Sequence, residues 1–149
     1  FTPILVGTLA EYGCEMAYHK VCDDDPAGIT AAILDAKAAG CELIFTTGGM
    51  SVDPDDRTPL AIRNTGARII TYGAPVLPGA MFLLSDLEGA PVCGLPGCVM
   101  YAKRTIFDLL LPRLLADDPI TEEEIAALGE GGLCLGCADC RWPNCGFGH

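Results

Sequence analysis

The sequence predicts an α/β fold of three layers, in which helices cover both faces of a mostly parallel sheet. Helical and strand-like patterns alternate from residue 1 to residue 73, and this alternation is typical of parallel strands joined by right-handed crossover helices. The short apolar run at 41–47 suits a strand that is buried on both faces of such a sheet. Two further apolar runs, at 81–84 and 91–95, predict a short β-hairpin insertion, and a cysteine-rich tail ends the sequence.

The first elements follow from apolar spacing and from capping residues. Apolar side chains recur at helical spacing over 4–12, and Gly13 stands where a glycine commonly ends a helix. Residues 14–21 alternate along the chain, which predicts a strand. The next helix is expected to begin at Pro26, with Asp25 as its N-cap.

The middle of the chain continues this pattern. A short helix is expected to start near Thr58, and the run at 67–73 predicts another strand. After the hairpin, the long apolar pattern at 98–116 predicts one helix, with Pro112 as a kink or a break.

A short acidic helix is expected within 118–132, because Thr121 and Glu124 fit a capping box. The length of 149 residues suits one domain. We expect it to be divided into an α/β domain, an acidic helix with a linker, and a cysteine-rich metal-binding tail, at 1–116, 117–132 and 133–149.

The charge balance argues against two classes of partner. The net charge is −11, and the chain has only nine Lys and Arg residues. Nucleic acids and anionic membranes are both bound mainly through basic side chains, so we expect neither partner. No apolar run approaches the ~18 residues that suggest a membrane-spanning helix. An anionic small molecule would need main-chain amides or a divalent cation to hold it.

The nine cysteines fall into two groups. Five are scattered and are typical of buried thiols in a reducing, cytoplasmic compartment: Cys14, Cys22, Cys41, Cys93 and Cys98. Four have the spacing C-x2-C-x2-C-x4-C near the end of the chain: Cys134, Cys137, Cys140 and Cys145. This spacing favours a [4Fe–4S] cluster slightly over a Zn²⁺ site, and four unligated thiols are the alternative.

Three loops are expected to meet at one edge of the sheet. TTGGMSVDPDDRTP includes the end of the strand at 41–47, DDD follows the strand at 14–21, and GLPG includes the end of the strand at 91–95. Ligands of open α/β sheets bind beyond the carboxyl ends of the strands. This convergence predicts a binding site.

The loop residues suit a phosphate and a cation. Gly48 and Gly49 permit a sharp turn that presents amides to an anion, although a tight turn without a ligand explains them equally well. Asp56 and either Asp24 or Asp25 could hold Mg²⁺. Capping of helices is the alternative role of these carboxylates.

Two turns contain proline and glycine. The GLPG turn at 94–97 lies near the start of the long predicted helix, whose first amides are free to bind an anion. A plain entry into the helix is the alternative. The LPG sequence at 77–79 alone indicates only a turn.

Taken in order, these motifs resemble the molybdopterin-binding domain of molybdenum-cofactor biosynthesis proteins. The resemblance rests on TTGGMSVDPDDRTP, LPGAMF and PVCGLPGCVMYAKRTIFDLLLPRLL and extends over 1–116. VCDDDPAGI resembles the acidic segment before the family's second helix. The family's first strand is then expected upstream of Phe1, and the resemblance implies a homo-oligomer, either a trimer or a dimer.

The resemblance also implies ligands and site residues. The ligands would be molybdopterin, Mg²⁺, ATP or AMP, and molybdate. Asp56 matches the family's functional aspartate, which implies a catalytic role and, together with Asp24, a role in holding the metal. The residues implied to bind the pterin or the nucleotide are Thr47, Gly48, Gly49, Met50, Ser51, Asp24, Asp25, Pro78, Gly79, Leu95, Pro96 and Gly97.

The residues do not choose between the two enzymatic branches of the family, molybdopterin adenylyltransferase and molybdopterin molybdenumtransferase. DDRTP resembles the first branch, whereas GMS and GLPG resemble the second. Cys98 replaces a common asparagine, and Ala80 stands where a lysine is frequent. A non-catalytic molybdopterin sensor or carrier with a metal-sensing tail is therefore the alternative to an enzyme, and a scaffold domain is the third hypothesis.

Overall fold

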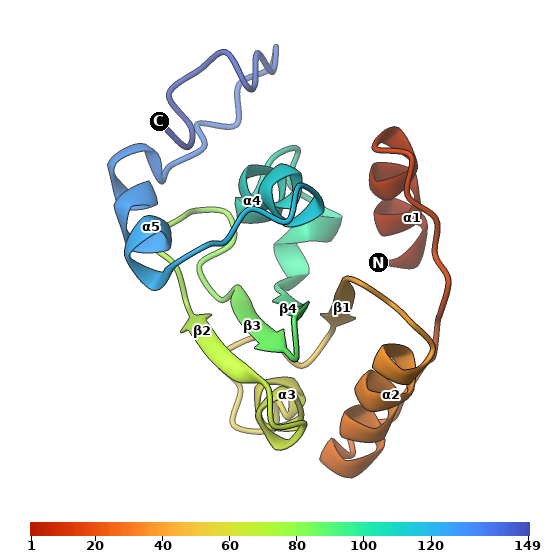
Figure 1. The fold of residues 1–149 in the computed structure, drawn as a ribbon. Helices are drawn as coiled ribbons and strands as arrows, with labels where there is room; N and C mark the ends of the chain where they lie inside the picture. Colours follow the sequence, from red (N-terminus) through yellow and green to blue (C-terminus); the bar gives the residue numbers. More distant parts are fainter.

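Four strands form one mixed sheet in the computed structural model, which describes residues 1–149 (Figure 1). The sheet order is β1-β4-β3-β2, and the strands are β1 (Ile44–Thr47), β2 (Arg68–Tyr72), β3 (Leu83–Leu87) and β4 (Ala90–Leu95). β1 and β4 are parallel, whereas β3 is antiparallel to both of its neighbours. The prediction of a mostly parallel sheet was therefore wrong, because the expected hairpin forms the centre of the sheet and is not an insertion.

The segment at 14–21, for which the sequence predicted a strand, has no regular structure. Residues 15–24 make no hydrogen bond between backbone groups. The segment instead connects the first two helices: the His19 ring lies 3.2 Å from the Thr2 hydroxyl, and Lys20 lies 3.9 Å from Asp35. Its alternating side chains predicted a strand, but β1 pairs only with β4 and no strand lies beside the segment.

Two helices, α2 (Pro26–Ala38) and α3 (Thr58–Asn64), cover one face of the sheet (Figure 1). Asp25 caps α2 as expected, because its carboxylate accepts hydrogen bonds from the amides of Ala27 and Gly28. The Thr30 hydroxyl donates to the Ala61 carbonyl at 2.9 Å and ties the two helices together. The core on this face consists of Ile33, Ala36, Ile44, Met50, Ile62, Ala67, Leu83, Leu87 and Val92.

The other face is covered by α1 (Thr2–Glu11) and α4 (Ile106–Leu115), with α5 (Glu122–Ala127) beside them. The larger core cluster of 14 buried residues lies here. It is centred on α4, where Phe107 meets Phe45 of β1 with the ring centroids 5.3 Å apart. Gly13 follows α1 with a φ of 73°, as expected of a glycine that ends a helix.

The long helix predicted at 98–116 is only partly present. Residues Gly97–Met100 form a 3₁₀ turn, and α4 begins only at Ile106. Thr105 and Asp108 form a capping box that starts this helix. α4 then runs through Pro112 without a break. The apolar pattern before Thr105 belongs to a buried turn, which apolar spacing alone does not distinguish from a helix.

The acidic helix is shorter than its expected range, because α5 ends at Ala127 and a 3₁₀ turn follows at Leu128–Gly131. Its predicted capping box, between Thr121 and Glu124, is present. None of the helices has the length and the apolar character that crossing a bilayer requires.

Candidate functional site

Two of the three predicted loops leave the sheet side by side. β1 and β4 are parallel, and Thr47 at the end of β1 lies opposite Leu95 at the end of β4. The glycine loop that begins at Gly48 and the turn that begins at Pro96 therefore start at the same edge. This edge is where an open α/β sheet offers a ligand site.

The glycine loop turns sharply at Gly48 and Gly49. Both residues have positive φ angles, 80° and 60°. The Gly48 carbonyl accepts a hydrogen bond from the Thr58 hydroxyl at 2.8 Å, which ties the loop to the first residue of α3. A Cβ atom at position 49 would lie 2.7 Å from that hydroxyl oxygen. The turn thus requires glycine for its own geometry and packing, and this requirement holds without a ligand.

Met50 belongs to the core. Its side chain is 3% exposed and packs directly over Gly94 of β4, where a Cβ atom would collide with the methionine. The side chain of Met50 is therefore not available to a ligand, and only its main-chain atoms can face one.

The loop after Met50 is closed by hydrogen bonds to carboxylates. The amide of Ser51 donates to a carboxylate oxygen of Asp56 at 2.7 Å, and the Ser51 hydroxyl donates to the same oxygen. Asp53 accepts the amide of Asp55 at 3.0 Å. The hydrogen bond from the Ser51 hydroxyl is the main cause that lowers the pKa of Asp56, so this carboxylate is charged at neutral pH. A backbone hydrogen bond from Asp53 also lowers this pKa, and the Asp56 residue is half-buried.

Asp24 and Asp25 are positioned by the start of α2 and not by a strand. Both side chains are exposed, and Asp25 is occupied as the N-cap. The premise that DDD follows a strand was wrong, because 14–21 forms none. No group of three or more His, Cys, Asp or Glu side chains is arranged to hold a metal ion, so Asp24 and Asp56 are not assembled with a third such side chain.

The turn after β4 differs from the expected helix entry. Leu95 and Pro96 are buried, whereas Gly97 is exposed at the start of the 3₁₀ turn. Cys98, which follows, is partly buried, and this burial raises the pKa of its thiol. The expected set of amides at the start of a long helix is absent here, because that helix begins nine residues further along, at Ile106.

Pro78 and Gly79 support the start of α4. The Pro78 carbonyl accepts the amide of Ile106 at 3.1 Å. Gly79 has a φ of 124°, and a Cβ atom there would collide with Ile106. The structure gives these two residues a packing role, and it shows no contact between them and the glycine loop.

The four cysteines of the tail are not gathered around one point. Cys134 is half-buried, and Cys137, Cys140 and Cys145 are exposed free thiols. The pKa of the Cys140 thiol is lowered mainly by a hydrogen bond from the Trp142 amide. The nearby Arg104 is the next cause of this lowering.

Sequence reasoning missed several residues around the site. Thr58 is buried and holds the glycine loop, although the sequence marked it only as a helix start. The tail contacts two basic residues: Lys103 donates to the carbonyls of Cys137 and Ala138, and Arg104 lies over the ring of Trp142. The Thr105-x-x-Asp108 pattern was a readable capping signal, whereas contacts between residues more than 30 positions apart leave no local signal.

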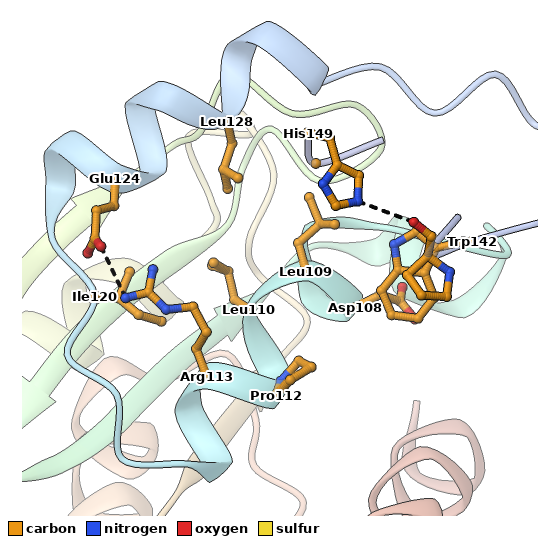
Figure 2. Close-up of a pocket in the computed structure, with 12 residues that line it drawn as sticks. Asp108, Leu109, Leu110, Pro112, Arg113, Ile120, Glu124, Leu128, Trp142 and His149 are labelled. Carbon is orange, nitrogen blue, oxygen red and sulfur yellow. Dashed lines mark hydrogen bonds and ion pairs between the residues drawn. The ribbon is translucent and has the colours of Figure 1, made fainter. Parts of the chain in front are cut away.

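A pocket lies elsewhere in the structure. Figure 2 shows it between α4, α5 and the end of the chain, with a volume of about 250 Å³. Leu109, Leu110 and Leu128 give it apolar walls. Arg113 is already paired with Asp118 and Glu124. The pocket contains none of the predicted site residues, so we place the candidate site at the β1–β4 edge, where the glycine loop begins.

The chain is similar in sequence to known proteins. Residues 1–116 match the family described as "Probable molybdopterin binding domain". The chain is 42% identical over 127 residues to a molybdenum cofactor biosynthesis bifunctional protein of Synechococcus elongatus, with 76% of this chain and 40% of that protein covered. It is 30% identical over 104 residues to a molybdopterin molybdenumtransferase of Haemophilus influenzae, with 70% of this chain and 25% of that protein covered. The chain thus spans well under half the length of these relatives.

Two solved structures share the fold. The molybdopterin biosynthesis moea protein from Pyrococcus horikosii matches with a TM-score of 0.59 and 24% identity, over 78% of this chain and 29% of that one. The protein CinA with unknown function from Thermoplasma acidophilum matches with a TM-score of 0.53 and 18% identity, over 78% of this chain and 86% of that one.

Proposed function

Because this chain belongs to the molybdopterin-binding domain family, we propose that it holds molybdopterin or its adenylate at the β1–β4 edge during molybdenum-cofactor biosynthesis. The observation that carries this proposal is the parallel pairing of Thr47 with Leu95, which starts the glycine loop and the Gly97 turn at one edge. Main-chain amides of that edge suit a phosphate, and they need no basic patch on a chain of net charge −11.

The ligand phosphate is held by Thr47, Gly48, Gly49 and Ser51 on one side and by Gly97 on the other. Gly48 and Gly97 are exposed and Gly49 is half-buried, so the main chain is most accessible at the first two. Five other residues support this edge of the sheet from inside the protein: Met50, Leu95, Pro96, Pro78 and Gly79. This assignment changes the role that the resemblance implied for these five residues, because Met50, Leu95, Pro96 and Gly79 are buried and Pro78 packs against α4.

Asp56 is the residue proposed to hold Mg²⁺. It is charged, and one of its oxygens is fixed by Ser51. Mg²⁺ commonly takes one or two carboxylates and completes its shell with water and phosphate oxygens. Asp24, on the α2 side, is the second carboxylate in this proposal, and the bound ion would neutralise charge on the phosphate.

The reaction served by this site is nucleotidyl transfer to the pterin or molybdenum insertion, with ATP, AMP or molybdate as co-ligands. For phosphoryl and nucleotidyl transfer, a protein mainly has to position the reacting groups and neutralise the charge on the phosphate. The glycine loop and Asp56 would supply both. By the same family resemblance, copies of the chain associate with one another.

A second candidate is a carrier that binds molybdopterin without turnover. Lys103 is a basic residue that follows the Gly97 turn in sequence. Its ammonium group donates hydrogen bonds to the carbonyls of Cys137 and Ala138. This contact favours binding without catalysis in this conformation of the tail.

Calorimetry with molybdopterin, with and without Mg²⁺, tests the proposal. We expect binding that Mg²⁺ strengthens, and an Asp56→Asn variant that loses the Mg²⁺ effect while Asp53→Asn retains it. Release of AMP or pyrophosphate distinguishes the enzyme from the carrier. If wild-type protein shows no molybdopterin binding in either condition, the proposed function is wrong.

A further inference from the structure

The segment at 134–145, which we name the cysteine loop, lies across the start of α4 and is tied down at both ends. The amide of Cys134 donates to the Leu77 carbonyl at 2.9 Å. Beyond the other end of the loop, the amide of Gly148 donates to the Gly131 carbonyl at 2.7 Å, and Phe147 is buried. Only the middle of the loop is therefore free to change shape without loss of these attachments.

The middle of the cysteine loop contacts two basic residues. The Lys103 ammonium donates to the carbonyls of Cys137, at 3.4 Å, and Ala138, at 3.0 Å. The guanidinium carbon of Arg104 lies 4.5 Å from the centroid of the Trp142 ring, a cation–π contact. Lys103 and Arg104 follow the Gly97 turn closely in sequence, so the loop binds positive charge on the segment that leads from that turn to α4.

The four thiols of the cysteine loop have the composition of a thiophilic metal site but not its geometry. Their C-x2-C-x2-C-x4-C spacing allows short connections around one ion. In the structure, three of the four are exposed, and no three of them are close enough to share a metal. Ligation by all four therefore requires the middle of the loop to rearrange around Cys134.

We propose that the cysteine loop is a metal-responsive strap, in which one Zn²⁺ ion bound by Cys134, Cys137, Cys140 and Cys145 releases Lys103 and Arg104. Each thiol that ligates the ion gives its proton to solvent, and no electron is transferred. The backbone that now accepts from Lys103 belongs to Cys137 and its neighbour, so turning Cys137 toward the ion removes those acceptors. Trp142 lies between two of the ligands and leaves Arg104 in the same movement.

The consequence for the β1–β4 edge rests on the proposed function. Once released, Lys103 attracts an anionic ligand that the strapped form binds weakly, whereas Arg104 stays paired with Asp108 at 2.8 Å. One added charge near a surface phosphate should raise the affinity for an anion by about fivefold when the metal binds.

Trp142 provides a direct test, because it is the only tryptophan in the chain. Reduced, full-length protein is titrated with Zn²⁺ alone, and both the bound zinc and the tryptophan emission are measured. We expect one Zn²⁺ per chain and an emission change that saturates at the same ratio. A Cys140→Ser/Cys145→Ser variant loses both, whereas Cys22→Ser, outside the loop, retains both. Absence of zinc uptake, or uptake without a change in emission, overturns the proposal.

A second titration uses inorganic pyrophosphate as the anion. We expect it to bind about fivefold more tightly to the zinc-loaded protein, and Lys103→Gln to remove this gain. Equal affinity with and without Zn²⁺ overturns the strap. If pyrophosphate binds in neither state while Zn²⁺ still changes the Trp142 emission, the anion site of the proposed function fails and the metal response of the loop stands.

Discussion

Ser51 and Asp56 close the loop at the β1–β4 edge, because both the amide and the hydroxyl of Ser51 donate to one carboxylate oxygen of Asp56. The amide-to-carboxylate distance is 2.7 Å. This pair fixes the shape of the exposed segment between Met50 and α3 around a charged carboxylate. The site is thus organised by hydrogen bonds within the loop before any ligand arrives.

The Ser51 contact predicts an acidic titration of Asp56. Its pKa is lowered from the ordinary value of 3.8, so the charged form is favoured in the folded protein. The contribution of this pair to stability is therefore present above pH 3.8 and is lost as the pH falls through the lower, folded-state pKa. Carboxyl NMR titration of Asp56 should show a midpoint below 3.8, and Ser51→Ala should raise it. A midpoint at or above 3.8 in the unmodified protein contradicts this assignment.

The turn at Gly49 predicts a marked cost for any side chain there. Gly49→Ala places a Cβ atom in the left-handed region, which costs about 1–2 kcal/mol, and brings it against the Thr58 hydroxyl. Urea unfolding should show a loss of at least that size. Gly7→Ala is the matched control, because no atom lies within 4 Å of its Cβ position in α1, and it should stabilise the chain by about 0.5–1 kcal/mol. Equal effects of the two substitutions would argue against the strained turn.

Met50 should behave as a core residue and not as a ligand contact. Its side chain is 3% exposed, whereas that of Val52 is 83% exposed. Met50→Ala should therefore destabilise the protein by about 2–5 kcal/mol, and Val52→Ala should change stability by no more than about 0.5 kcal/mol. Denaturant midpoints and slopes measure both effects. A Met50→Ala variant of unchanged stability would mean that the packing over Gly94 is wrong.

The buried and the exposed cysteines should differ strongly in their reactivity toward an alkylating agent. Cys93 is fully buried in β4, and burial strongly raises the pKa of its thiol. Cys137 and Cys145 are exposed. Brief treatment of the native protein with iodoacetamide, followed by peptide mass spectrometry, should modify the exposed pair and leave Cys93 intact. Cys93 should react only after unfolding, and its early modification in native protein would contradict the core described here.

Local patterns predicted the elements that depend on local chemistry. Asp25 caps α2, Gly13 ends α1, and the capping box of Thr121 and Glu124 starts α5, because each feature involves residues a few positions apart. The β3–β4 hairpin was also predicted from its two apolar runs. These signals need no knowledge of distant segments.

The errors arise where distant segments decide the structure. Residues 14–21 have a strand-like pattern, but a strand needs a partner, and β1 pairs only with β4. The apolar residues before Thr105 continued a helical pattern, yet the helix starts at the Thr105–Asp108 capping box. The contacts of Lys103 with Cys137 and Ala138 join positions that no local pattern connects. For the same reason, the sequence indicated the loops of the candidate site but not the roles of Thr58, Met50 and Gly79 in their packing.

The central claim is that the glycine loop and the Gly97 turn act together at one edge of the sheet. Amide NMR spectra recorded during a molybdopterin titration with Mg²⁺ test this claim most directly. The amides of Gly48, Gly49, Ser51 and Gly97 should shift with one common dissociation constant. Shifts confined to the pocket between α4 and α5, around Leu109 and Leu128, would contradict it.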